Sequence, residues 1–379
     1  MNKKNTASLG VFTRIVGSQW FVSVISVVIA FLIGAILIAM TGASVTDAYY
    51  AMFRGAIVDP QASTFVRTIK PLMDSVYFAI PLIISGLGLA FGFRAGLFNI
   101  GGKGQMIAGA LAAVWVGFSL SLPPVVHTLV ALLVAVIAGG LYGGIAGVLK
   151  AKTGANEVIV TIMLNSIATL GLGYTLAQKA WQVPGTNQPV TPKVADSAAL
   201  VRLLPAPFKL HVGFLVAIVA LGVFWWLIER STLGFQIRAV GANAAAARTA
   251  GISVERITAI TMVLSGAFLG LAGANEALGT IGYVSRDVAG SIGFDAITVA
   301  LLGRNKTWGT FGAGLLFGAF KAGGYTMQAK GVPIDMILIL QSVIVLLIAA
   351  PALVRWLFRL PDVRALAANT RKGNADEHK

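Results

Sequence analysis

The sequence predicts an all-α, polytopic membrane protein with about ten transmembrane segments and with both termini in the cytoplasm. Of its 379 residues, 57% are hydrophobic and 11% are charged, whereas a soluble domain carries about 25% charged residues. Apolar runs of about 20 residues recur along the chain, and this length crosses the roughly 30 Å hydrocarbon core of a bilayer. Basic residues lie between these runs, as is typical of cytoplasmic loops.

Composition also excludes several classes of function. The formal net charge is +15, but the basic residues do not cluster with aromatics on one polar domain, so we expect no nucleic-acid partner. The chain contains no cysteine, which excludes disulfides and thiolate metal sites. The histidines are scattered among predicted loops and the tail, so no metal site is expected. They are His127, His211 and His378.

The N-terminal part begins with residues 1–19, a polar and basic segment expected in the cytoplasm. Trp20–Met40 is the first expected span. A signal peptide is the alternative, but the apolar core is too long for one. Thr41–Lys70 is expected to form an external loop. Leu72–Phe93 is the second span, which we expect to be broken at Pro81 because proline removes a helical hydrogen bond.

The remaining spans complete a membrane domain over residues 20–354, and residues 355–379 form a cytoplasmic tail. The connection Gln178–His211 is a long external loop with five prolines, and Leu278–Ser291 is an external segment dotted with glycine. Ile292–Leu302 is too short to cross a bilayer as a straight helix. The expected segments are Met106–Leu120, Val125–Leu149, Glu157–Ala177, Val212–Ile228, Ile257–Ala274, Ile292–Leu302, Phe311–Gln328 and Ile334–Val354.

Glycines of the span Val125–Leu149 recur at spacings of three and four, so they share one face of the helix. Small residues at this spacing let two membrane helices approach closely. We therefore predict tight packing of this face against another helix. The glycines are Gly139, Gly140, Gly143, Gly144 and Gly147.

Residues 229–256 form the longest basic and weakly apolar interval between two strongly apolar spans. Asn243 can cap a short helix through its side chain, and Ala244–Ala247 are strong helix formers. Gly251 can end this helix in the left-handed conformation. Ser253 is a second N-cap candidate, with Glu255 in the first turn that follows, where the helix dipole favours an anion.

The basic residues of this interval predict its side of the membrane. Arg230, Arg238, Arg248 and Arg256 place it in the cytoplasm by the positive-inside rule. A short helix of small residues outside the bilayer offers a surface to a soluble partner. The alternative is a solvated connector.

The glycine-rich segment Gly96–Gln105, GLFNIGGKGQ, resembles a phosphate-binding loop only at first sight. The glycine before Gly102–Lys103 is displaced by one residue, and Gly104 stands where Ser or Thr would hold magnesium. The chain therefore has no P-loop of its own. Such a segment suits a re-entrant or broken helix, and both tight packing and direct lining of a path remain open.

Polar residues inside predicted spans are costly there and tend to face the interior of a bundle. Asn165 is the most central, and it either lines a path or ties two helices together. Glu276 and Asp295 lie nearer the outer face, where a solvated position is the alternative. Because a chain of carboxylates is absent, proton coupling is disfavoured. The full set is Asn165, Asn275, Glu276, Asp295, Lys321 and Gln341.

Four blocks resemble, in order, permeases of ABC importers of the branched-chain amino acid and simple-sugar group. They are GLFNIGGKGQ, ANEVIVTIMLNSIA from Ala155, GFQIRAVGANAAAARTAGI from Gly234 and GFDAITVALLGRNKTWGTFGAGLLFGAF from Gly293. The first two are most similar to the subfamily that works with basic-membrane-protein lipoproteins and imports nucleosides. The resemblance covers nearly the whole chain after about Leu72. Lys103 departs from it, because the family usually has Glu there.

The resemblance implies a cobalamin-importer-like transmembrane fold in the cell membrane of a prokaryote. It also implies a second, related permease subunit, an external substrate-binding lipoprotein and a separate ATP-binding subunit. ATP and magnesium would reside on that subunit, so this chain needs no cofactor and is not itself an enzyme. Contact with the ATPase maps onto the interval 229–256, with the residues Arg238, Gly241, Asn243, Ala246, Arg248 and Gly251.

The translocation path is expected to use aromatic faces and amide or carboxylate groups, as a nucleoside requires. Packing is the alternative role for each residue. An ion-coupled secondary transporter, a channel or scaffold, and a permease for simple sugars or branched-chain amino acids are the competing functions. The candidates are Tyr77, Phe78, Phe98, Asn99, Asn165, Glu276 and Gln341.

Overall fold

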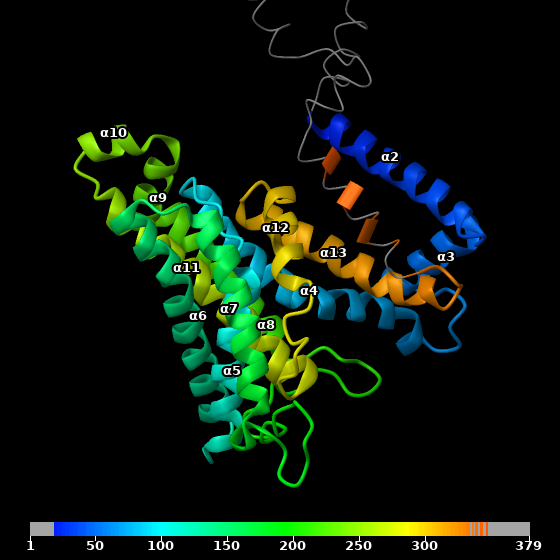
Figure 1. The fold of residues 1–379 in the computed structure, drawn as a ribbon. Helices are drawn as coiled ribbons and strands as arrows, with labels where there is room; N and C mark the ends of the chain where they lie inside the picture. The colour runs from blue at the N-terminus through cyan, green and yellow to red at the C-terminus, as the bar shows by residue number, and fades with distance from the viewer. Residues whose placement is uncertain (1–18, 334–335, 337, 340–341, 344–345, 348–379) are drawn as a thin grey trace, which may run out of the picture. The chain divides into compact units, whose positions relative to one another are not determined.

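The computed structural model describes residues 19–333 and the positions 336, 338, 339, 342, 343, 346 and 347. The expected N-terminal segment, the cytoplasmic tail and Gln341 lie outside the described residues, as does most of the last expected span. The described part is helical, and its one isolated β-bridge joins Arg202 to His211. Figure 1 shows the order of the helices.

Fourteen of the elements below are α- or π-helices, and most of them match expected spans. They are α2 (Gln19–Met40), α3 (Val45–Ala56), α4 (Phe65–Arg94), α5 (Gly102–Ser119), α6 (Val126–Thr153), α7 (Glu157–Ala177), α8 (Gly213–Trp225), the π-helix η2 (Trp226–Arg230), α9 (Thr232–Ala242), α10 (Ala244–Thr249), α11 (Val254–Asn275), the π-helix η3 (Glu276–Ile281) and α12 (Ile292–Leu302). The 3₁₀ turn η1 (Lys179–Trp181) and α13 (Thr307–Gln328) complete the described elements.

Two expectations about these elements were wrong, and a third segment has helical structure that was not predicted. The stretch Thr41–Lys70 is not a plain loop, since it contains α3 and the first turns of α4. Pro81 does not break the second span, because α4 continues through it; other helices enclose this half of α4, and proline is tolerated in membrane helices under such support. The segment after Asn275 starts as the π-helix η3 before the loop begins.

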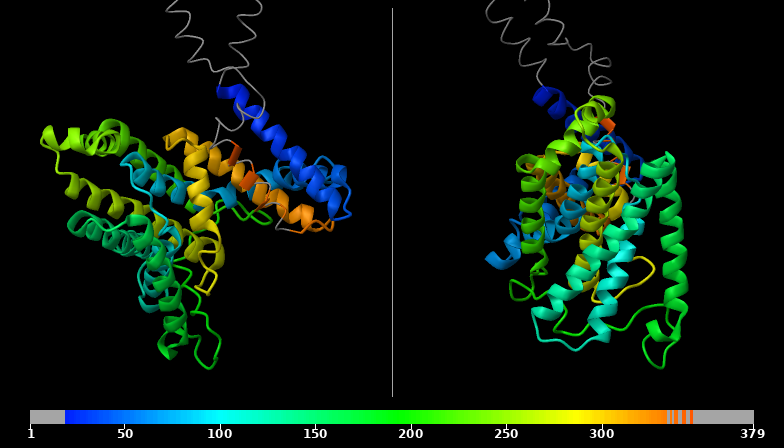
Figure 2. Two further views of the ribbon diagram at one scale, coloured as in Figure 1. Left: turned by 45° about the horizontal axis from the view of Figure 1, so that its top comes forward. Right: turned by 90° about the vertical axis from the view of Figure 1, so that its left-hand side faces the viewer.

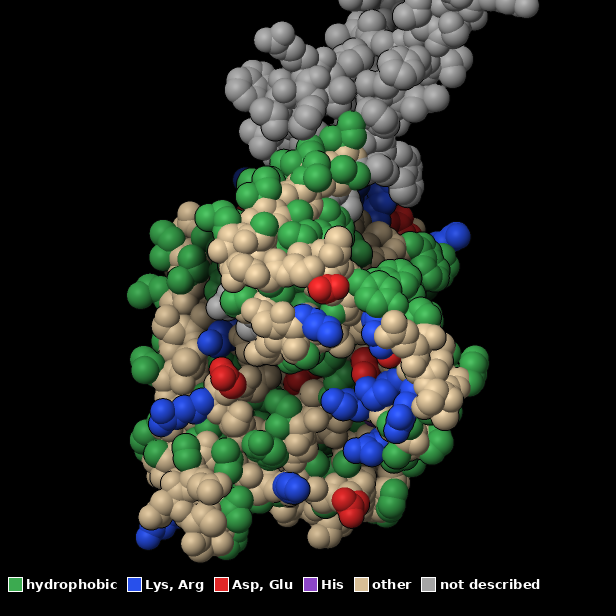
Figure 3. All heavy atoms as spheres, turned by 90° about the vertical axis from the view of Figure 1, so that its right-hand side faces the viewer, with side chains coloured by type: hydrophobic (Ala, Val, Ile, Leu, Met, Phe, Trp, Pro, Cys, Tyr) green, Lys and Arg blue, Asp and Glu red, His purple; other side chains and the backbone are tan. Residues whose placement is uncertain are grey.

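The length and composition of the helices fit a membrane protein. Among the described residues, five helices are long and apolar enough to cross a bilayer. On the face drawn in Figure 3, uncharged side chains and backbone cover most of the surface, and charged side chains occur in small groups. The candidate spans are Phe65–Arg94, Val126–Thr153, Glu157–Ala177, Gly213–Arg230 and Val254–Ile281.

The chain divides into two compact units. The smaller unit comprises residues 1–52 and 324–379. Within it, the Tyr49 hydroxyl donates to the carbonyl of Phe31, and their rings meet edge to face at 5.3 Å between centroids. The hydroxyl of Thr326 donates to the carbonyl of Ala51 at 2.7 Å. The larger unit, residues 53–323, contains the helices α4 to α12.

Helix α11 forms the centre of the larger unit, where it packs against α4, α5 and α6. The predicted glycine face of α6 meets α11 directly. A methyl group on Gly143 would lie 2.6 Å from the carbonyl oxygen of Met262 and 2.9 Å from Cα of Gly266. Because atoms so placed would overlap, the two backbones touch without intervening side chains, as the small-residue spacing predicts.

Candidate functional site

Helices α9 and α10 lie at one end of the larger unit, and the long connection between α7 and α8 lies at the other (Figures 1 and 2). Helix α11 begins directly after α10. Beyond its far end, the backbone of η3 and the following loop bonds to this connection, as in Leu200 N–H to Leu278 carbonyl at 3.1 Å. These opposite ends are called the α10 end and the loop end below.

The interval 229–256, called the α10 segment below, has the local structure that its sequence predicts. Asn243 caps α10 by accepting from the Ala246 N–H at 3.0 Å. Gly251 has φ of +81°, the left-handed conformation that ends a helix at low cost with glycine. Ser253 caps α11 by accepting from the Arg256 N–H at 3.4 Å. The preceding helix α9 and its cap Ser231 were missed, although a serine before Thr232–Ala242 is a usual start signal.

The surface of α10 consists mainly of small exposed side chains. Ala246 is exposed, whereas Ala247 is buried. Arg248 is exposed and pairs with Glu255 within the same segment at 2.8 Å. Arg238 is half-buried, and its Nη1 atom has no hydrogen-bond partner among the described residues.

Gly241 connects the α10 segment to the membrane helices. A methyl group there would lie 2.1 Å from the carbonyl oxygen of Arg94, so α9 touches the end of α4 through its backbone. Arg94 in turn donates from Nε to the Asn305 carbonyl at 2.8 Å and approaches Glu229 at 3.6 Å. A displacement of α9 would therefore reach α4, η2 and the turn after α12 by direct contact.

Asn165 joins α7 to the glycine-rich segment. Its Oδ1 accepts from the Gly104 N–H and its Nδ2 donates to the Ile100 carbonyl, both at 2.8 Å. The Ile100 N–H donates to the hydroxyl oxygen of Thr161 at 3.2 Å. Both functional groups of the amide are thus used, and this geometry favours the interpretation that Asn165 ties elements together.

A second amide stabilises the same segment from inside. Asn99 is 1% exposed. Its Nδ2 donates to Gln105 at 3.0 Å and to the Ser265 hydroxyl at 2.9 Å, and its Oδ1 accepts from the Gly101 N–H at 2.9 Å. This network provides hydrogen-bond partners to the irregular backbone before α5, and backbone groups inside a membrane domain need such partners.

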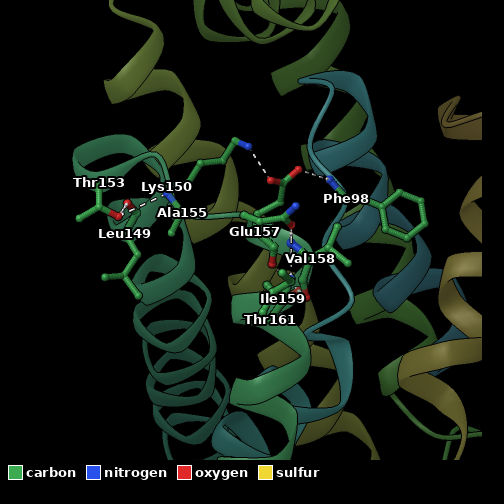
Figure 4. A network of polar contacts seen from close by, with 10 residues as sticks. Phe98, Leu149, Lys150, Thr153, Ala155, Glu157, Val158, Ile159 and Thr161 are labelled. Carbon is green, nitrogen blue, oxygen red and sulfur yellow. Dashed lines mark hydrogen bonds and ion pairs between the residues drawn. The ribbon is translucent and has the colours of Figure 1, made fainter.

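Charged groups complete the attachment of the segment at its exposed edge. Figure 4 shows Glu157 between the ammonium group of Lys150 and the backbone of Phe98. The Phe98 N–H donates to Glu157 at 3.3 Å, while its ring meets Phe93 at 5.0 Å. Lys103 lies in the first turn of α5 and has no ion pair among the described residues.

The remaining path candidates lie toward the loop end. From the 1.5 Å rise per residue, about 25 Å of α4 separates Tyr77 from Arg94. The ring of Tyr77 meets Phe78 at 5.2 Å and His211 at 5.6 Å, both edge to face. The structure thus separates Tyr77 and Phe78 from the pair Asn99 and Asn165.

Glu276 also lies toward the loop end and is buried rather than solvated, at 8% exposure. The hydroxyl of Thr280 donates to it at 3.3 Å. Asp295 is not solvated either, since it pairs with Lys321 at 3.0 Å and accepts from the Ser291 hydroxyl at 2.8 Å. Asp295 thus has a cation as partner, and Glu276 has a hydroxyl group.

His211 and Asn275 form a buried polar pair beside Tyr77. They are 1% and 0% exposed. Nδ1 of His211 accepts from the Gly213 N–H at 3.1 Å, whereas its Nε2 has no partner among the described residues. Both polar atoms of the Asn275 amide also lack one. His211 was not among the predicted site residues, because a lone histidine in a proline-rich loop carries no periodic signal.

The described residues contain no group of three or more His, Cys, Asp or Glu side chains able to hold a metal ion. The long apolar helices and the exposed short helix between two of them define the class of multi-pass membrane proteins.

The chain belongs to the family described as the permease component of the branched-chain amino acid transport system, which matches residues 72–349. A guanosine ABC transporter permease of Bacillus subtilis is 38% identical over 89% of this chain and 95% of the relative. A nucleoside ABC transporter permease of Lactococcus lactis is 32% identical, over 92% and 95%. A glucose ABC transporter permease of Haloferax volcanii is 34% identical, over 85% of each.

No solved structure matches this chain. The family and these relatives identify it as a permease subunit of an ABC importer. Permease components of ABC transporters are not catalytic themselves.

Proposed function

We propose that this subunit forms the translocation path for nucleosides in the cell membrane of a prokaryote. The similarity to a guanosine and a nucleoside permease over nearly the full lengths of the chains supports this substrate class. In this proposal the fold is cobalamin-importer-like, with about ten spans and both termini in the cytoplasm. A second permease subunit and an external substrate-binding lipoprotein complete the importer.

The observation that carries the mechanism is the exposed helix α10 together with the preceding helix α9, whose Gly241 contacts the backbone of α4. We propose that α10 docks into a groove of a separate ATP-binding subunit, because a helix with small exposed side chains can enter a groove closely. ATP-driven closure of that subunit then moves α9 and α10. Gly241 and Arg94 transmit the movement to the membrane helices, and the path opens alternately to the two sides.

Replacement of Ala246 by Trp tests the docking step. The exposed indole should overfill the groove, so co-purification with the ATPase and ATP-driven uptake should fall together while membrane insertion persists. Ala177→Trp is the matched control, because Ala177 is also exposed but is the last residue of α7, at the loop end. If α10 is only a solvated connector, Ala246→Trp will co-purify and transport like the unmodified chain.

The glucose permease relative supports a sugar as the second candidate substrate. Proteoliposomes containing the whole importer should accumulate guanosine in an ATP-dependent manner and should exclude glucose. The reverse result would assign the chain to sugars. Uptake that persists in vesicles without the ATPase would instead support an ion-coupled carrier.

A further inference from the structure

The buried pair His211 and Asn275 holds hydrogen-bonding capacity that the chain itself does not use. Because Nδ1 of His211 accepts from the Gly213 N–H, the proton of the neutral ring is on Nε2, which makes this atom a donor. The Asn275 amide adds a donor and an acceptor. All three atoms are buried and lack a partner among the described residues, and such groups in a native protein call for an explanation.

The two side chains lie close enough to contact one ligand. A methyl group on Gly213 would lie 2.1 Å from Nδ2 of Asn275 and 2.5 Å from Cε1 of His211, so both groups surround the same point. A methyl group on Gly279 would lie 2.8 Å from Nε2 of His211. The ring of Tyr77 stands edge to face with His211 at 5.6 Å. An aromatic ring, two donors and an acceptor thus converge where α4, α8 and η3 meet.

The backbones at Gly213 and Gly279 close this site in the present conformation. Gly279 belongs to the π-helix η3, which starts directly after Asn275. Wide turns of this kind inside α-helices occur frequently at functional sites, where they interrupt the regular hydrogen-bond ladder. Movement of η3 away from the start of α8 would expose the three unpaired atoms together.

We propose that His211 and Asn275 bind the base of a purine nucleoside when the path is open toward the loop end. The chemistry is complementary: the Asn275 amide can pair with the adjacent donor and acceptor on the six-membered ring, and Nε2–H of His211 can donate to N7. Tyr77 supplies an aromatic neighbour. This inference rests on the proposed function and adds the residues that read the base.

The test uses a substrate that lacks one acceptor. The complete importer, with its own lipoprotein and ATPase, is assayed for uptake of guanosine and of 7-deazaguanosine, whose N7 is replaced by carbon. The unmodified permease should prefer guanosine, and His211→Phe should reduce that preference by about 3- to 10-fold, the equivalent of one hydrogen bond. Since the lipoprotein is unchanged, a change in the ratio reports the permease.

Asn275→Asp provides an independent measurement. A carboxylate accepts only, so it should favour guanosine, which presents two adjacent donors, over adenosine, which presents an acceptor beside its amino group. Ser166→Leu, on an exposed position of α7, is the control that should leave both ratios unchanged.

The possible outcomes separate the claims. If both variants retain the unmodified ratios, whether or not total uptake or thermal stability falls, the pair binds only an ordered water and the inference is wrong. If the unmodified importer takes up no nucleoside at all, the proposed function itself fails. Changed ratios in both variants, with the control unaffected, support the base-binding site.

Discussion

At the scale of the residue, Asn165 shows how a polar group inside a span is used. Its central position in a predicted span followed from the sequence, but that position suits either a residue that lines the path or one that connects two helices. In the structure, the amide oxygen accepts from the Gly104 N–H and the amide nitrogen donates to the Ile100 carbonyl. The sequence could not resolve this, because the partners belong to an irregular segment about 60 residues earlier, whose path no periodicity describes.

Asn165→Leu should destabilise the protein, because it leaves a buried N–H and a buried carbonyl without partners, each worth about 1–3 kcal/mol. We expect a lower midpoint of thermal unfolding in detergent and impaired assembly with the partner subunits. Ser166→Leu, exposed on the adjacent position, should leave the midpoint unchanged. A stable, assembled Asn165→Leu protein that fails only in transport would restore the path interpretation.

His211 makes stability depend on pH. Burial lowers the pKa of its ring from 6.5 to about 4. Between these values the unfolded chain binds the proton and the folded chain does not, so stability is complete above about pH 6.5 and is lost as the pH falls toward 4. The loss should reach about 2 kcal/mol near pH 5. Thermal melts of the unmodified protein and of His211→Gln should show this component only in the former.

At the scale of the element, most helices were predictable because spans are long apolar runs. The bounds Glu157–Ala177 and Ile292–Leu302 agree with the expected ones. Helix α3 was missed because Val45–Ala56 is short and contains the charged residues Asp47 and Arg54, a pattern that is typical of loops. The π-helices were missed because their hydrogen-bond pattern depends on tertiary contacts rather than on composition.

Gly143→Leu should separate α6 from α11. The leucine Cβ would meet Met262 and Gly266 backbone atoms at distances that no rotamer relieves. We expect low yield and a lower midpoint of thermal unfolding in detergent. Gly171→Leu, on α7, is the control because no atom lies within 4 Å of the corresponding Cβ. Equal stability of the two variants would contradict the close-packing account.

At the scale of the whole molecule, the family followed from the order of four blocks, whereas the orientation rests on charge alone. A cysteine at Ala245, on α10, should be protected from an impermeant thiol reagent in intact cells. A cysteine at Asn187, exposed in the connection before α8, should react. The natural chain has no cysteine, so labelling reports only the introduced position. Labelling of the α10 position from outside would show that the proposed orientation is reversed.

The glycine contact between α6 and α11 has a consequence for movement. Side-chain interfaces can slide by exchanging rotamers, but two backbones in direct contact have no rotamers to exchange. Helices α6 and α11 should therefore move as one rigid body, with α10 at the α10 end and the buried pair His211 and Asn275 at the loop end. A displacement of α10 would then be transmitted along α11 to the loop end of the larger unit with little loss.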